Sequence, residues 1–207
     1  MTVIGNRRSA IVIYSDASSI ESHRVRLVLA EKEISSETVE VLPGEVNDEL
    51  REFNPQGVVP AIVDRDLALY GSRVIIDYLD ERYPHPPFMP VDPVSRARTR
   101  LALYRIESDW YSLLPGTPGL GLSDDEAITR LSDAITEAND VFSALPFFFS
   151  EEYSMLDATL APLLWRLPAY GIVLPEKASA VSQYASRMFA RPGFEASLSD
   201  TEKDMRV

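Results

Sequence analysis

The sequence predicts a two-part protein, with a small α/β layer followed by an all-α region. Three observations support this fold class. Strand and helix patterns alternate over the first eighty residues, a proline-rich segment follows, and only helical patterns come after it. The order β-α-β-α-β-β-α describes parallel strands joined by a helix, then a hairpin and a covering helix. With 207 residues and 45% hydrophobic content, the chain can bury one ordinary core or two small ones.

The first elements follow from hydrophobic runs and their spacing. Ala10 to Tyr14 is a short apolar run with β-branched residues, which indicates a buried strand. A helical pattern follows from Ser22 to Glu33, and Thr38 to Val41 alternates as a second strand. Asn47 to Phe53 predicts a short helix.

A hairpin and a third helix complete the α/β layer. The apolar runs Ala61–Val63 and Leu67–Tyr70 flank the polar triplet at 64–66, which is typical of a hairpin. A helix is predicted from Ser72 to Arg82. Its expected inward-facing residues are Val74, Ile75, Tyr78 and Leu79.

Five of the fifteen prolines fall between Tyr83 and Pro93, and this density predicts a rigid extended linker. We therefore place an α/β domain at 1–83, with a polar tail at 1–8, a linker at 84–93 and an all-helical domain at 94–207. The helices expected in the last domain begin near Val94, Ser123, Ser154 and Glu176, and a further short one follows Pro192. Acidic residues and a capping-box pattern mark the start at Ser123.

Composition excludes several kinds of site. The absence of cysteine excludes disulfides and thiolate ligands, and the two histidines, His23 and His85, are too few for a histidine-rich metal site. No metal or other cofactor is expected. The chain has neither a long apolar stretch nor a secretory signal, so we expect a cytoplasmic protein without a membrane contact. Its net charge of −12 argues against direct DNA reading and favours a protein partner with basic surfaces.

Three short motifs resemble the cytosolic glutathione transferases. Asn54-Pro55-Gln56-Gly57-Val58-Val59-Pro60 is similar to a family turn whose proline is cis and whose preceding residue pairs with the glutathione backbone. Gly71-Ser72 resembles the pair that receives the γ-glutamyl carboxylate at a helix start, and Ser154 to Asp157 resembles the family's capping box. The resemblance implies the glutathione-transferase fold, with a thioredoxin-like N-terminal domain and a helical C-terminal domain.

The resemblance of residues 22–26 to the family's first helix implies that Ser19 stands where the serine or cysteine class enzymes have their activating residue. A hydroxyl at a helix N-terminus can donate to the glutathione thiolate, although most serines before helices are simple caps. Gly71 stands where the enzymes have Glu or Gln, and loss of that charge-assisted hydrogen bond costs roughly 1.5–3 kcal/mol of ligand binding. We therefore interpret Ser19, Val59, Pro60 and Ser72 as a vestigial glutathione pocket without catalytic residues.

Longer passages resemble the stringent starvation protein A family within this superfamily. They lie at 25–32, 78–87, 105–111 and 161–168, and the second contains Pro84-His85-Pro86-Pro87. The resemblance implies a homodimer without transferase activity that binds the RNA polymerase holoenzyme or its sigma factor during starvation or acid stress. The implied contact surface is the exposed Pro-His-Pro segment, with Tyr83 and Pro87 beside it.

Three other interpretations remain open. Prolines present a pre-ordered surface at low entropic cost and a histidine changes charge near about pH 6.5, but the same segment also fits a plain interdomain linker. The alternative function is a glutathione-dependent transferase that uses Ser19. A small metabolite in the vestigial pocket is a third possibility.

Overall fold

A computed structural model describes residues 10–44, 47–117 and 120–206. Contacts divide the chain into two compact units. The first comprises the described residues up to Pro86 together with Pro192–Met205, and the second comprises Pro87–Arg191 and Arg206. The domain limits predicted above differ at the C-terminal end, because residues 192–205 belong with the first unit by contact.

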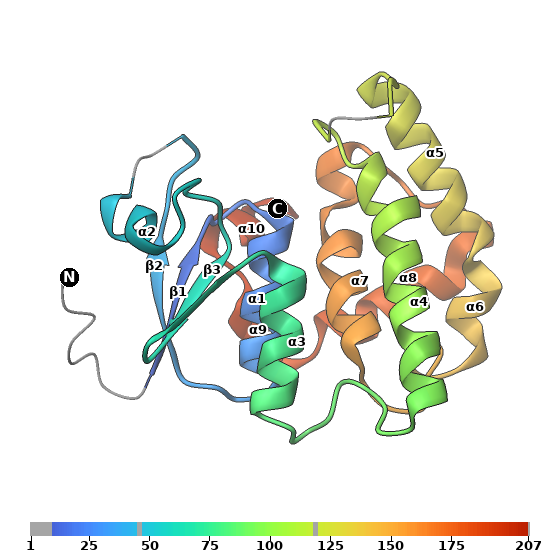
Figure 1. The fold of residues 1–207 in the computed structure, drawn as a ribbon. Coiled ribbons are helices and arrows are strands. Elements are labelled where there is room, and N and C mark those ends of the chain that lie inside the picture. The colour runs from blue at the N-terminus through green and yellow to red at the C-terminus, as the bar shows by residue number, and fades with distance from the viewer. Residues whose placement is uncertain (1–9, 45–46, 118–119, 207) are drawn as a thin grey trace. The chain divides into compact units, whose positions relative to one another are not determined.

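The first unit is built on a four-stranded mixed sheet with the strand order β2-β1-β3-β4 (Figure 1). The strands are β1 (Ile11–Ser15), β2 (Ser36–Glu40), β3 (Ala61–Asp64) and β4 (Leu67–Tyr70). β1 pairs in parallel with β2 and antiparallel with β3, and β3 and β4 form the hairpin. The predicted fold class, an α/β layer followed by helices, is confirmed.

Helices cover both faces of this sheet. Figure 1 shows α1 (Ile20–Glu31) and α3 (Ser72–Arg82) on one side and α2 (Asp48–Phe53) on the other. Leu50 of α2 packs with residues of the sheet in a buried cluster that also contains Val12, Tyr14, Val41 and Ala61. The burial of these apolar side chains is the main stabilising contribution to the layer.

The inward face of α3 is rotated by one position from the prediction. Val74 is 54% exposed, whereas Ile75, Ile76 and Leu79 are fully buried. The buried row continues through Asp80, which is buried because its carboxylate pairs with Lys32. The apolar pattern alone could not predict this rotation, since it scores an aspartate as a surface residue.

Two short C-terminal helices, α9 (Pro192–Ser197) and α10 (Asp200–Asp204), pack in the first unit. Polar side chains join them to α1. His23 Nε2 lies 3.0 Å from Ser197 Oγ, and Glu202 pairs with Arg26 at 2.6 Å and with His23 at 3.5 Å. His23 and Glu202 are fully buried, so this cluster fixes the C-terminal segment and leaves His23 inaccessible to a ligand.

The second unit is helical. Its helices are α4 (Pro93–Asp109), α5 (Asp124–Glu137), α6 (Asn139–Ala144), α7 (Met155–Arg166) and α8 (Ser179–Phe189). Three 3-10 turns lie between them, η1 (Tyr111–Leu113), η2 (Pro168–Tyr170) and η3 (Glu176–Ala178). Both predicted capping boxes are present, at Ser123 with Glu126 and at Ser154 with Asp157. Asp157 is fully buried and also accepts a hydrogen bond of 2.6 Å from the Tyr184 hydroxyl.

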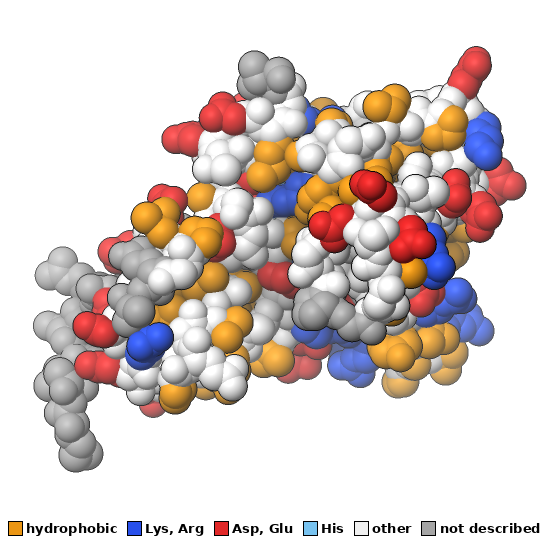
Figure 2. Space-filling model, turned by 90° about the horizontal axis from the view of Figure 1, so that it is seen from above, with side chains coloured by type: hydrophobic (Ala, Val, Ile, Leu, Met, Phe, Trp, Pro, Cys, Tyr) orange, Lys and Arg blue, Asp and Glu red, His pale blue; other side chains and the backbone are white. Residues whose placement is uncertain are grey.

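Acidic side chains dominate the charge of the surface. On the face drawn in Figure 2 they are scattered among uncharged and hydrophobic side chains. Within the described ranges, no helix is long and apolar enough to cross a membrane.

Candidate functional site

The predicted contact surface forms an exposed turn at the end of α3. Pro84, His85, Pro86 and Pro87 are all exposed, and Tyr83 is half-buried. The guanidinium of Arg82 lies 5.3 Å from the centre of the Tyr83 ring, a cation–π contact. The His85–Pro86 peptide bond is cis. The segment therefore presents pyrrolidine rings and an imidazole to the solvent.

A buried lysine lies beneath this turn. Lys32, at the end of α1, has a side chain with no exposed surface. Its ammonium group lies 2.8 Å from Asp80 Oδ1, 2.8 Å from the Tyr83 carbonyl oxygen and 2.6 Å from the Pro86 carbonyl oxygen. A lysine ammonium has three N–H donors, so these three oxygens are enough to satisfy it. The positive charge also lies at the C-terminal end of both α1 and α3, where it is favourable.

The predicted pocket residues lie at the opposite end of the α1–α3 pair. Ser19 is the N-cap of α1, and its hydroxyl accepts the Ser22 amide at 3.3 Å. Ser72 is the first residue of α3 and is buried. The Val59–Pro60 bond is cis, as the motif predicts, and the Pro60 carbonyl accepts the Gly71 amide at 3.1 Å. The turn at Pro60 is thus attached directly to the start of α3.

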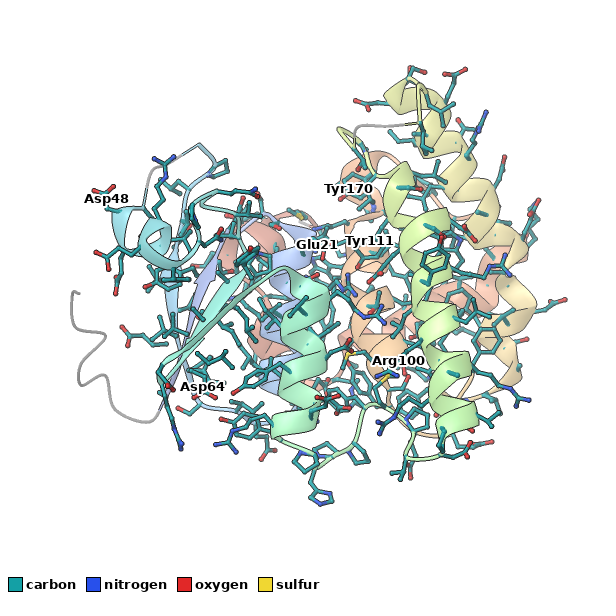
Figure 3. All side chains as sticks on the ribbon, in the orientation of Figure 1. Glu21, Asp48, Asp64, Arg100, Tyr111 and Tyr170 are labelled. Carbon is teal, nitrogen blue, oxygen red and sulfur yellow. The ribbon has the colours of Figure 1, made fainter. Side chains whose placement is uncertain are left out.

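The Ser72 hydroxyl is bonded to a carboxylate of the chain itself. It donates to Glu21 Oε2 of α1. Arg24 Nη1 lies 3.1 Å from the same Glu21 oxygen and 3.4 Å from Ser72 Oγ. Figure 3 shows Glu21 at the N-terminal end of α1. Its side chain is 39% exposed, whereas that of Arg24 is 2% exposed. An internal carboxylate therefore occupies the hydrogen-bonding position of Ser72 and compensates a buried guanidinium.

This arrangement offers little for catalysis. The Ser19 hydroxyl acts as a helix cap, the Ser72 hydroxyl is bonded to Glu21, and no histidine is bonded to either serine in the interactions described above. Across the part of the chain that the structure describes, no group of three or more His, Asp or Glu side chains is placed to hold a metal ion. Arg24 and Ser72 can bind an anion at this end of the helix pair, and the carboxylate of Glu21 already occupies that position.

Sequence reasoning missed two residues of these sites, Glu21 and Lys32. The spacing of Glu21 and Arg24 by three positions predicts their ion pair on one helix. The bonds of Glu21 to Ser72 and of Lys32 to Tyr83 and Pro86 span about fifty residues, and no local pattern predicts such bonds. Lys32 stands between Glu31 and Glu33, so the local sequence marks it as an ordinary surface residue and gives no signal of its burial.

Known relatives are similar over almost the whole chain. A sequence profile described as "Glutathione S-transferase, N-terminal domain" matches residues 13–87. The stringent starvation protein A homolog of Pasteurella multocida is 44% identical over 200 residues, which cover 96% of this chain and 94% of that protein. The chain belongs to the stringent starvation protein A family. The homolog from Coxiella burnetii is 40% identical and covers 97% of each chain, so the match includes both units.

Solved structures place this family member in the glutathione-transferase fold. A tau class glutathione S-transferase of mango, Mangifera indica, superposes with a TM-score of 0.80 at 23% identity, covering 96% of this chain and 97% of the other. The theta class enzyme of Xanthomonas axonopodis, solved with glutathione bound, gives a TM-score of 0.78 at 21% identity, with 92% and 97% covered. At these identities the similarity establishes the fold alone.

Proposed function

We propose that the protein is a non-enzymatic transcription regulator that binds the RNA polymerase holoenzyme, through the polymerase or its sigma factor, in starvation and acid stress. The observation that carries this proposal is the exposed turn at Tyr83–Pro87, whose two ends are held by a buried ammonium group. A surface that is already ordered loses little conformational entropy when a partner docks on it. Membership of the stringent starvation protein A family supports the same role.

The charge of the chain fits a protein partner better than a nucleic acid. The 32 acidic and 20 basic residues give a surface that repels phosphate backbones and attracts basic protein surfaces. We therefore propose that the protein acts in the cytoplasm through the polymerase and contacts neither DNA sequence nor membrane. Tyr83, Pro84, His85, Pro86 and Pro87 are the proposed contact residues.

The state of the old ligand pocket supports the absence of transferase activity. Ser19, the catalytic candidate of the alternative function, caps α1 as an acceptor, which does not engage its own O–H. The support comes from Ser72, whose hydroxyl is bonded to Glu21. A γ-glutamyl carboxylate entering this position would have to displace Glu21 from both Ser72 and Arg24. The entering carboxylate would form similar bonds, so Glu21 acts as an internal competitor that lowers the net gain from glutathione binding.

We propose further that the protein is a homodimer in which α4 contacts a second copy. One face of this helix carries large exposed apolar side chains, Val94 at 58%, Leu101 at 60% and Tyr104 at 65%. Their spacing follows the helical repeat, and Arg98 is exposed between them. A hollow of about 420 Å³ opens on the same face. Exposed apolar stripes of this kind are typical of subunit contacts.

The dimer is tested by light scattering after gel filtration. Leu101→Asp places a charge in the middle of the stripe and should convert the dimer to a monomer. Val173→Asp is the matched control, because Val173 is 87% exposed in the same helical unit but lies outside α4. A Leu101→Asp protein that remains dimeric would remove α4 from the interface.

The regulator is tested by retention of purified polymerase holoenzyme on the immobilised chain, with a glutathione titration by calorimetry on the same sample. We expect polymerase to be retained and glutathione to give no heat. Pro84→Ala/His85→Ala should abolish retention, whereas the control Pro43→Ala/Pro55→Ala, which changes two other exposed loop prolines, should preserve it. Tight glutathione binding without polymerase retention would establish the transferase alternative instead.

A further inference from the structure

The exposed turn contains few groups that could hold its own shape. Pro84, Pro86 and Pro87 have no backbone N–H, and the Tyr83 amide is already bonded to the Leu79 carbonyl at the end of α3. Ordinary turns are closed by a backbone N–H that donates to a carbonyl three residues before it. In this segment the residue three positions after Tyr83 is a proline, so that bond cannot form. The carbonyl groups of the turn need a donor from elsewhere in the chain.

Lys32 supplies this donor at both ends of the turn. Its Nζ lies 2.8 Å from the Tyr83 carbonyl oxygen and 2.6 Å from the Pro86 carbonyl oxygen, and the side chain is wholly buried. The ammonium group thus replaces the missing turn bond with two charge-assisted bonds, which are stronger than neutral ones. The Asp80 carboxylate, whose Oδ1 lies 2.8 Å from Nζ, neutralises the positive charge of Lys32.

We propose that Lys32 is the positioning residue of this turn: its ammonium group ties the Tyr83 and Pro86 carbonyls together, so that Pro84 and His85 project as one fixed surface. The importance of that surface for partner binding rests on the function proposed above. The tie itself is a property of this chain and can be measured without any partner.

A compact ammonium suits this site better than other side chains. Two backbone carbonyls and one carboxylate converge on a single atom, and the three N–H bonds of lysine point in separate directions. Arginine has a planar fork that prefers two acceptors in one plane, so Lys32→Arg is not a conservative change here. Methionine has a similar length and no donor, which makes it the appropriate replacement.

The experiment compares Lys32→Met/Asp80→Asn with Asp80→Asn alone. Removing the lysine alone would leave the Asp80 carboxylate buried without its charge partner, and the protein could lose stability for that reason. Asparagine at position 80 removes this charge from both proteins and still offers an amide oxygen to Lys32. The difference between the two variants then reports on all the bonds that Lys32 makes, and the two bonds to the Tyr83 and Pro86 carbonyls are the ones that act on the turn.

The local measurement is the NMR order parameter of the His85 backbone amide, taken at a temperature where circular dichroism shows both variants to be folded. We expect about 0.8 in Asp80→Asn and less than about 0.6 in the double variant, the range of a flexible loop. Equal order parameters in the two variants would overturn the proposal. The polymerase affinity of the double variant should fall roughly tenfold or more relative to Asp80→Asn, because two or more residues must then be ordered on binding.

The outcomes separate this inference from the proposed function. A mobile turn with unchanged polymerase affinity overturns the positioning role, although the polymerase is still bound. A wild-type protein that binds no polymerase refutes the proposed function, while the order parameters still decide whether Lys32 fixes the turn.

A chemical rescue provides a test that does not depend on the stability of the methionine variant. The chain contains no cysteine, so Lys32→Cys in the Asp80→Asn background introduces a unique thiol. Alkylation of the unfolded protein with 2-bromoethylamine restores an ammonium group of nearly lysine length, and 1-bromopropane adds a neutral chain of the same shape. After refolding, the ammonium form should recover the His85 order parameter and the propyl form should not. Equal order in both forms would overturn the proposal.

Discussion

The bond between Glu21 and Ser72 is tested by a double-mutant cycle. The perturbations are Glu21→Ala, Ser72→Ala and the two together, and they remove only the groups that join the N-terminal ends of α1 and α3. The Ser72 hydroxyl donates to Glu21 Oε2, and Arg24 donates to the same oxygen at 3.1 Å. Arg24 is present in all four proteins but contacts both side chains, so the coupling free energy measures the Glu21–Ser72 bond together with any change in their contacts with Arg24.

The magnitude follows from the chemistry and exposure of the pair. A hydrogen bond to a charged acceptor contributes about 1.5–3 kcal/mol when it is buried. Ser72 is 6% exposed, but the Glu21 side chain is 39% exposed, so water competes for the carboxylate. We therefore expect a coupling free energy near the lower limit, about 1–2 kcal/mol. Glu21→Ala alone should be the more damaging change, because it also leaves the buried Arg24 guanidinium without this carboxylate.

The assay is urea unfolding followed by far-UV circular dichroism. Trp110 and Trp165 both lie in the second unit, so tryptophan fluorescence serves as an internal comparison for the unit that is not changed. The control is a second cycle on Arg73 and Asp77, a half-exposed pair on α3 at 3.4 Å, for which about 0.3–0.5 kcal/mol is expected. If the Glu21–Ser72 coupling does not exceed that of the control pair, Glu21 does not hold Ser72 and the account of the closed pocket fails.

Three further predictions concern stability. Tyr184→Phe removes one of the hydrogen bonds to buried Asp157 without creating a cavity. It should lower the free energy of unfolding by about 2 kcal/mol and the melting temperature by roughly 4–8 °C. A change below about 0.5 kcal/mol would contradict this prediction. The pKa of Glu126 is lowered by its hydrogen bond with the Ser123 backbone amide, so its contribution to the free energy of unfolding is present above the pKa of the unfolded chain and is lost as the pH falls. Glu126→Gln should therefore flatten the curve of stability against pH between about pH 5 and pH 3. An unchanged slope would count against the capping box. Leu131→Ala, at a fully buried position, should cost about 2–5 kcal/mol in urea unfolding, whereas Val173→Ala at an 87% exposed position should change the stability by less than about 0.5 kcal/mol.

The fold could be predicted because its elements are encoded locally. The apolar run near Ile13, the hairpin around Arg65 and the capping box at Ser123 each depend on residues a few positions apart. The errors arise where a distant partner changes the burial of a residue. Asp80 is buried and pairs with Lys32, and the buried face of α3 includes Ile76 and Asp80 in place of Val74. Residues 192–205 likewise group with the first unit through contacts with the distant α1, among them those of Phe194 and Ser197 with His23 and of Glu202 with Arg26.

The sequence predicts the exposed residues of the candidate site, which remain a prediction as a contact surface, and it does not predict their buried partner. The prolines and His85 were singled out by the resemblance to the stringent starvation protein A family, since the residues alone also fit a plain interdomain linker. Lys32, which contacts the turn, and Glu21, which contacts Ser72 and Arg24, are charged residues at the two ends of α1 and have no distinctive local sequence pattern. Their roles depend on which atoms face them across about fifty residues of chain, and only three-dimensional contacts can show that.

These two missed residues lie at opposite ends of one helix pair. Glu21 joins the N-terminal ends of α1 and α3, and Lys32 joins their C-terminal ends, so the two helices run parallel. A carboxylate at the N-terminal ends and an ammonium group at the C-terminal ends both compensate the helix dipoles. The charged groups at the two ends of the helix pair have different consequences for ligand and partner binding. At one end the charge satisfies Ser72 and Arg24 from inside the chain, which disfavours a carboxylate ligand. At the other end it holds two carbonyls and projects His85 outward, which favours a protein partner.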